Sequence, residues 1–263
     1  MPIWVYHLPN FWLALFIVMV MEVVSIIGLL LIRRFLIPRL DFHDGVSDAI
    51  SGTAQAIGVF YGITVGLLAV GVWNTYSSSS NLVSNEAAAI GVMYRDVSSY
   101  PEPTRSAMQA KLREFTLSII NDDWPAQKSG RVAMSGGVIL DDLQSRLYSY
   151  EPAGASMTSV HGETLRAYNK LIEARRLRID AVESHLSTPM WAVIWIGAAV
   201  SIAVAYLYKI RDLRIHLILI GLMAGFLGIL IFMIVINDRP FLGYVSIPTD
   251  PYQLILDRVI DRK

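Results

Sequence analysis

Four long apolar segments, two towards each end of the chain, constrain this sequence more than any other feature. They cover approximately residues 11–32, 52–73, 189–207 and 215–236. Each approaches the roughly 20 residues that an α-helix needs to cross about 30 Å of hydrocarbon. Apolar residues form 54% of the chain and concentrate there, whereas polar residues gather in 74–188. This segregation predicts an all-α, multi-pass membrane protein with four transmembrane helices.

Composition and charge exclude several functional classes. The chain has no cysteine, which excludes disulfides, thiolate catalysis and iron–sulfur clusters. Its net charge is zero, so no bulk attraction to nucleic acid is expected. The five histidines have no metal-ligand spacing, and no catalytic triad, phosphate loop or carboxylate pair is evident. We therefore expect no enzyme, no metal or cofactor site and no nucleic-acid partner.

The polar middle of the chain has the pattern of a helical domain. Residues 80–98 continue the second apolar segment without a proline, and Tyr100–Pro103 must interrupt that helix. Residues 104–122 carry apolar side chains on one stripe, and 158–186 form a second long amphipathic pattern. Because no alternating strand pattern appears, we expect 74–188 to be a helical extramembrane domain.

The second apolar segment carries a ridge of small residues. Ala54, Gly58, Gly62 and Gly66 recur every four positions, which lets another helix approach closely. Either this helix lines a pore at the axis of a homo-oligomer, or the ridge packs within one four-helix subunit, and the spacing favours neither. The segment is nearly free of charge and has no acidic ring, so such a pore would favour an anion or be unselective.

Glu22 lies in the middle of the first apolar segment. A carboxylate there costs roughly 2.5–3.5 kcal/mol on insertion scales, so it is a candidate functional residue. It is either a proton-binding group, or a partner of a neighbouring helix, or a protonated carboxyl that bonds the backbone or Ser25.

Charged residues outside the apolar segments form a second set of candidates. In the middle region they are Glu86, Arg95, Asp96, Arg175, Arg176 and Arg178. They either shape the field at the mouth of a pore or form salt bridges between the two long helices, with Arg176 and Asp180 at the helical i,i+4 spacing. We favour pairing, at exposed sites that contribute at most about 1 kcal/mol. Asp238 and Arg239 end the fourth segment and are expected to pair with groups at the membrane interface.

Basic residues in the two short links suggest an orientation. They are Arg33, Arg34 and Arg39 after the first segment, and Lys209, Arg211 and Arg214 after the third. The positive-inside rule places both links in the cytoplasm, and therefore places the middle domain and both termini outside.

Six short motifs in order resemble one family. They are Trp73-Asn74-Thr75-Tyr76, Asn85-Glu86-Ala87-Ala88, Tyr94-Arg95-Asp96-Val97 with Tyr100-Pro101, Asp123-Trp124-Pro125, Arg175-Arg176-Leu177-Arg178 and Asp238-Arg239-Pro240-Phe241-Leu242-Gly243. With the four-span layout, they resemble the bestrophin-like family of bacterial and plant membrane proteins. The resemblance covers nearly the whole chain, so 1–263 is expected to form one bestrophin-like membrane protein.

The resemblance implies a channel. True bestrophins are pentameric anion channels whose second span lines the pore, and by that likeness Gln55, Val59 and Ile63 would face the pore axis. The bulky aromatic neck and the acidic calcium-binding cluster of animal bestrophins have no match here. Bestrophins also keep the middle domain in the cytoplasm, opposite to the orientation that the basic links suggest.

We therefore expect a homo-oligomeric, anion-conducting channel in the inner membrane, with a pentamer favoured. Its partners would be further copies of itself, membrane lipids and the permeant ion. Two alternatives remain open: a membrane-anchored scaffold or sensor without conductance, and a proton-conducting energiser subunit that uses Glu22 as the carrier.

Overall fold

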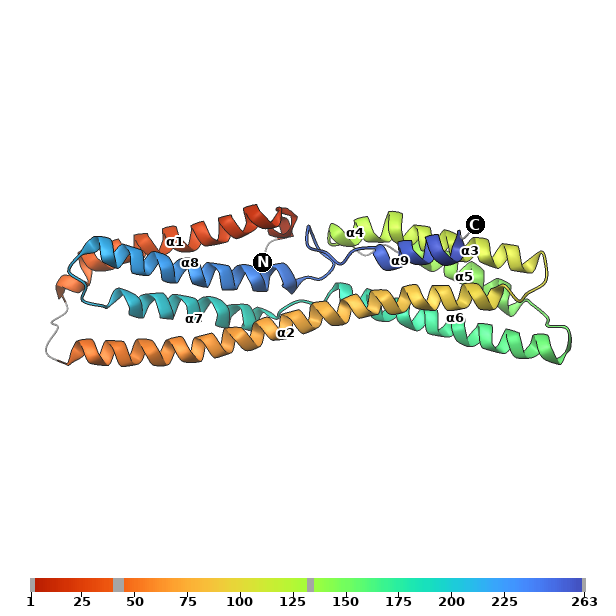
Figure 1. Ribbon diagram of the computed structural model, residues 1–263, viewed down its shortest axis with the longest axis horizontal. Helices are drawn as coiled ribbons and strands as arrows, with labels where there is room; N and C mark the ends of the chain where they lie inside the picture. Colours follow the sequence, from red (N-terminus) through yellow and green to blue (C-terminus); the bar gives the residue numbers. More distant parts are fainter. Residues whose placement is uncertain (1–2, 40–44, 132–134, 262–263) are drawn as a thin grey trace. The chain divides into compact units, whose positions relative to one another are not determined.

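A computed structural model describes residues 3–39, 45–131 and 135–261. Within these ranges the chain forms helices and connecting turns and contains no strand, which confirms the all-α prediction. The α-helices are α1 (Asn10–Phe35), α2 (Val46–Val97), α3 (Thr104–Ser118), α4 (Trp124–Lys128), α5 (Ser135–Tyr148), α6 (Gly154–Val182), α7 (Thr188–Tyr206), α8 (Leu213–Asp238) and α9 (Asp250–Ile255) (Figure 1). Short 3₁₀ helices cover Ile3–His7 and Ile37–Arg39, and π-helical turns cover Ile119–Asp123 and Leu256–Ile260.

The chain folds as two compact units. One contains Met1–Asn74 and His185–Asp238, and we call it the span unit. The other contains Thr75–Ser184 and Arg239–Lys263, and we call it the helical unit. Helix α2 is continuous and contributes residues to both units.

The span unit contains the four predicted transmembrane segments. Helices α1, α2, α7 and α8 are each long and apolar enough to cross a membrane. Prolines mark their limits: Pro9 precedes α1, Pro189 lies in the first turn of α7, and Pro240 follows α8. Proline is tolerated in a first turn but removes the N–H that a continuing helix needs, so these positions fit the boundaries.

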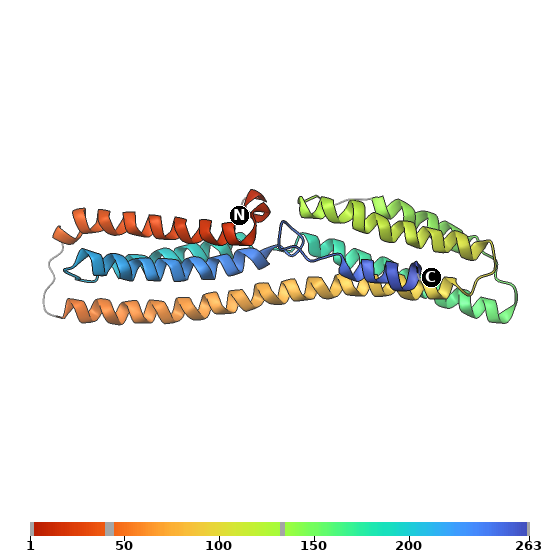
Figure 2. The same ribbon diagram turned by 45° about the horizontal axis from the view of Figure 1, so that its top comes forward.

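Glycines bring the helices of the span unit together. Helices α1 and α8 lie side by side (Figures 1 and 2), and a Cβ on Gly228 would lie 3.0 Å from the Cα of Val18. A Cβ on Gly28 would lie 2.5 Å from the hydroxyl of Tyr206, which donates a hydrogen bond to the Ser25 carbonyl at 2.8 Å. Small residues therefore set the close contacts among α1, α7 and α8.

The core of the helical unit follows the predicted amphipathic stripe. Met108, Leu112 and Phe115 on α3 and Ile119 in the following π-helical turn are completely buried. Helix α2 continues to Val97, as the absence of an earlier proline predicts.

The helical unit also contains the C-terminal segment Arg239–Lys263. The extramembrane domain expected from the sequence, 74–188, did not include this segment. Phe241 and Tyr252 are buried against the indole of Trp124. The Trp124 Nε1–H donates to the Ile247 carbonyl at 2.8 Å. A segment this short cannot form its own core, so its apolar side chains complete that of the helical unit.

Candidate functional site

The membrane part of α2 is the least covered of the four spans. Of the residues in its most apolar stretch, only 11% are buried, against 22% for α1, 22% for α7 and 39% for α8. Val59 is 60% exposed and Ile63 is 58% exposed, and Gln55 is exposed as well. The three residues predicted to face a pore therefore lie on a surface of α2 that other helices of the chain leave open.

The glycine ridge of α2 is also open. Within the described part of the chain, a Cβ added at Gly58, Gly62 or Gly66 would meet no atom within 4 Å. Ala54, one turn earlier, is only half-buried. The described residues therefore show no packing of these glycines against another helix of the same subunit, which was one of the two sequence interpretations.

Another side of α2 packs against α7 within the span unit. The Tyr61 hydroxyl donates to the Ile194 carbonyl of α7 at 3.0 Å, and a Cβ on Gly197 would collide with the Tyr61 ring. Val65, one turn further along, is buried. Helix α2 thus has a side held by α7 and an open side that carries the candidate pore residues.

Glu22 lies half-buried on α1 beside Gly225 of α8. A Cβ on Gly225 would lie 3.2 Å from its Oε1. The Ser25 hydroxyl donates to the Met21 carbonyl at 2.6 Å, and the hydrogen bonds of the described residues include none between Ser25 and Glu22. The missing side chain at Gly225 leaves room for the carboxyl group between the two helices.

Asp238, the last residue of α8, accepts hydrogen bonds from two other segments of the span unit. Its Oδ2 accepts from the Tyr6 hydroxyl at 2.9 Å, and its Oδ1 accepts from the Leu186 backbone N–H at 2.6 Å. Tyr6 lies shortly before α1 and Leu186 shortly before α7, so both partners are next to the ends of spans. The adjacent Arg239 is half-buried.

The helical unit contains a buried ion cluster that includes three of the six charged candidates. Its members are Glu86 (α2), Asp123 (the π-helical turn), Arg175 and Arg178 (α6) and Tyr252 (α9), and we call it the ion cluster. Glu86, Arg178 and Tyr252 are completely buried. The remaining candidates, Arg95, Asp96 and Arg176, lie outside it, and the Arg176–Asp180 pair predicted from spacing is not among the ion pairs of the described residues.

The contacts of the ion cluster centre on its two carboxylates. Glu86 Oε2 accepts from Arg178 Nε and, at 2.6 Å, from the Tyr252 hydroxyl. Asp123 Oδ2 lies 3.6 Å from Arg175 Nη1 and 3.6 Å from Arg178 Nη2. Asp123 Oδ1 accepts from the Ser135 hydroxyl at 3.2 Å. The cluster therefore joins helices from distant parts of the sequence.

Aromatic rings cover the two guanidinium groups. The Arg178 guanidinium lies 5.5 Å from the centre of the Trp124 ring, and that of Arg175 lies 5.2 Å from the centre of the Phe115 ring. Both distances are within the range of cation–π attraction. A Cβ on Gly136 would lie 2.5 Å from Arg175 Nη1, so the arginine fills the space that glycine leaves.

Burial and neighbouring charges oppose each other in the ion cluster. Burial raises the pKa of Asp123, while Arg175 and Arg178 act against that rise. Burial likewise lowers the pKa of Arg175. Burial and the Glu86 carboxylate hold the pKa of Tyr252 well above its usual range, so the phenol stays a neutral donor. Two acidic and two basic side chains balance formally, as enclosed charges must.

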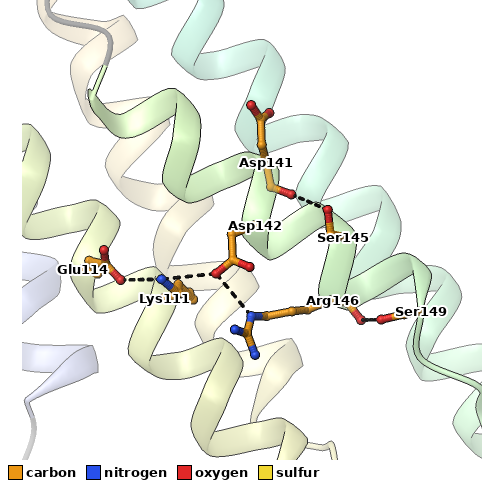
Figure 3. Close-up of polar contacts among 7 residues, drawn as sticks. All are labelled: Lys111, Glu114, Asp141, Asp142, Ser145, Arg146 and Ser149. Atoms are coloured by element: carbon orange, nitrogen blue, oxygen red, sulfur yellow. Dashed lines mark hydrogen bonds and ion pairs between the residues drawn. The ribbon is translucent and has the colours of Figure 1, made fainter.

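Exposed ion pairs form a separate network on the surface. Lys111 of α3 lies 2.8 Å from Glu114 and 3.1 Å from Asp142 of α5, and Arg146 also reaches Asp142 (Figure 3). The hydrogen bond from Lys111 lowers the pKa of Asp142. None of these residues is among the six charged candidates. Glu86 and Arg178 do pair between the two long helices, as expected, but the expected exposure is wrong because both are enclosed.

Comparison with known proteins defines the class and then the family. The crystal structure of a mutant bacterial bestrophin homologue from Klebsiella pneumoniae matches with a TM-score of 0.68 at 12% identity, over 95% of this chain and 99% of that chain. Two solved membrane proteins match with TM-scores of 0.70 (10% identity, 95% and 99% covered) and 0.63 (14% identity, 93% and 97% covered). At such identities the likeness establishes a shared fold.

The family follows from the sequence itself. A profile of the bestrophin-like domain matches residues 19–252, which is most of the chain, so the chain belongs to the bestrophin-like family. The match confirms the resemblance carried by the six motifs. No curated protein sequence matches the chain.

Proposed function

We propose that this protein is an ion channel built from several copies of the chain, with α2 lining the pore. The observation that carries the proposal is the open face of α2. The glycine ridge of this apolar helix meets none of the described residues of its own subunit, so its surface is available to other copies. Membership of the bestrophin-like family and the fold shared with a bestrophin homologue support the same function.

In this proposal Gln55, Val59 and Ile63 face the pore axis, while Ala54, Gly58, Gly62 and Gly66 pack against a neighbouring copy. A pore with valine and isoleucine at its constriction would gate by dewetting. The absence of a carboxylate among these residues favours anions. We place residues 74–188 outside the bilayer as the vestibule, and favour a pentamer in the inner membrane, surrounded by lipid.

Recording from purified protein in planar bilayers tests the proposal. We expect single-channel currents whose reversal potential follows the Cl⁻ gradient. Val59→Ala and Ile63→Ala should each raise the conductance by widening the pore. Ile229→Ala on α8 removes an equally exposed side chain and is the matched control. Silent bilayers under Cl⁻, K⁺ and H⁺ gradients would rule out a channel, and equal effects of all three variants would rule out α2 as its lining.

Glu22 favours a second candidate, a proton-conducting energiser subunit. Its carboxyl group lies within a span, beside a glycine and half-buried, and intramembrane carboxylates commonly carry protons. Glu22→Gln should then abolish proton flux in liposomes loaded with a pH dye. Under the channel proposal the same variant leaves Cl⁻ current largely unchanged.

A further inference from the structure

The ion cluster and its surroundings contain buried polar atoms that the described residues do not satisfy. These atoms are Glu86 Oε1, Asp123 Oδ2, Arg175 Nη1, both terminal nitrogens of Arg178 and both side-chain amide atoms of Gln127. In folded proteins more than about nine in ten buried polar groups have a hydrogen-bond partner. So many unsatisfied atoms among five residues indicate a missing bonding partner.

The geometry around Asp123 Oδ2 shows where that partner belongs. The oxygen lies 3.6 Å from Arg175 Nη1 and 3.6 Å from Arg178 Nη2. Direct N–H···O bonds need about 2.7–3.2 Å, so neither arginine bonds the oxygen directly. Water can bridge two polar groups that are more than about 3.5 Å apart. Asp123, at 1% exposed, is closed off from bulk solvent.

The mixture of donors and acceptors among the unsatisfied atoms favours water over an anion as the missing partner. The set contains donors, on Arg175 and Arg178, and acceptors, on Glu86 and Asp123. Water both donates and accepts, and a buried water typically makes about three hydrogen bonds. A halide only accepts, and it would lie against a carboxylate oxygen that already lacks a donor. Gln127, one helical turn after Asp123 and 2% exposed, carries a further unsatisfied donor and acceptor.

We propose that the helical unit encloses an ordered water molecule at this place. The water accepts from Arg175 Nη1 and Arg178 Nη2 and donates to Asp123 Oδ2. It thereby links the π-helical turn to α6 and gives a bonding partner to three of the unsatisfied atoms.

A high-resolution map of the full-length wild-type protein tests the proposal without any variant. We expect a peak within about 2.6–3.2 Å of Asp123 Oδ2 and of both guanidinium nitrogens. Direct arginine–aspartate contacts with no peak between them would overturn it. Crystals grown with bromide separate water from an anion: an anomalous peak at this position would also overturn the proposal.

Two adjacent glycines on α5 supply a variant and its control. A Cβ on Gly136 would lie 2.5 Å from Arg175 Nη1, whereas a Cβ on Gly137 meets no atom within 4 Å in the described part of the chain. Gly136→Ala should displace the arginine and remove the water peak, and Gly137→Ala should keep both. An unchanged peak when Arg175 has moved away would contradict the assigned bonds.

Discussion

At the scale of single residues, the enclosed Glu86–Arg178 pair is the strongest electrostatic feature of the helical unit. Both side chains are fully buried, and the Tyr252 hydroxyl adds a second bond to the same carboxylate oxygen. Taking two charges out of water is costly, and only their mutual attraction with further hydrogen bonds offsets that cost. The pair is therefore sensitive to the loss of either partner.

Glu86→Gln should destabilise the helical unit strongly. It leaves the buried charges of Arg175 and Arg178 with only the Asp123 carboxylate to balance them, and breaking a buried ion pair in this way typically costs about 3–5 kcal/mol. We expect a large fall in the melting temperature, followed by circular dichroism in detergent. Glu173→Gln on exposed α6 surface is the matched control and should change the melting temperature little. Equal melting of the two variants would contradict the importance of the buried pair.

Tyr252 should make stability depend on alkaline pH. Its folded-state pKa lies well above 10, because burial and Glu86 disfavour the phenolate. The folded state then binds this proton more tightly than the unfolded state, so its stabilisation is complete below pH 10 and falls as the pH rises above it. The melting temperature should therefore decline as the pH rises above about 10.

Tyr252→Phe is the test of that assignment. The variant should be less stable at neutral pH, since it loses the bond to Glu86, but its stability should decline less steeply with pH. Some decline will remain, because burial raises the pKa of Tyr168 to about 12. The same steepness in both proteins would show that Tyr252 is not the titrating group.

At the scale of helices, α2 differs from its neighbours in how it uses glycine. Gly28, Gly197 and Gly228 sit against side chains or backbone of the same subunit, so a larger residue would collide there. Gly58, Gly62 and Gly66 of α2 have no such neighbour among residues 3–39, 45–131 and 135–261. Glycine weakens an isolated helix by about 1 kcal/mol relative to alanine, so an open ridge is costly unless another copy packs on it.

Gly62→Leu should therefore impair assembly while leaving the subunit folded. The leucine fits within the isolated chain, but it blocks the close approach of a second copy. Light scattering of the detergent-solubilised protein should show a smaller oligomer, with helical content unchanged. Gly221→Leu on α8 also meets open space and serves as the control. Normal assembly of the α2 variant would remove the basis for packing along this ridge.

At the scale of the whole molecule, the chain passes twice through each compact unit. The final 25 residues return to the helical unit and supply Tyr252 to the ion cluster and Phe241 to the core. The helical unit therefore depends on sequence from both sides of α7 and α8.

Truncation after Asp238 tests this dependence. It removes the aromatic contacts to Trp124 and the Tyr252 donor of Glu86. We expect the helical unit to lose its cooperative melting transition and to become sensitive to limited proteolysis. The span unit keeps all its own helices and should still insert into membranes. A protease-resistant helical unit in the truncated protein would contradict the assigned role of this segment.

The sequence by itself determined the membrane spans, the helical class, the amphipathic stripe of α3 and the family. These properties depend on hydropathy, on local periodicity and on short motifs, which act within a few residues of one another. It also singled out Glu86, Arg175 and Arg178, through the motifs that contain them.

Only the tertiary structure decided how those residues are used. Glu86 meets Arg178 across 92 positions and Tyr252 across 166, and no local pattern encodes such contacts. Asp123 was visible as part of a motif, but its place beside two arginines depends on how the π-helical turn and α6 pack. The openness of the glycine ridge likewise had to be observed, because the same four-residue spacing fits packing within a subunit and between subunits.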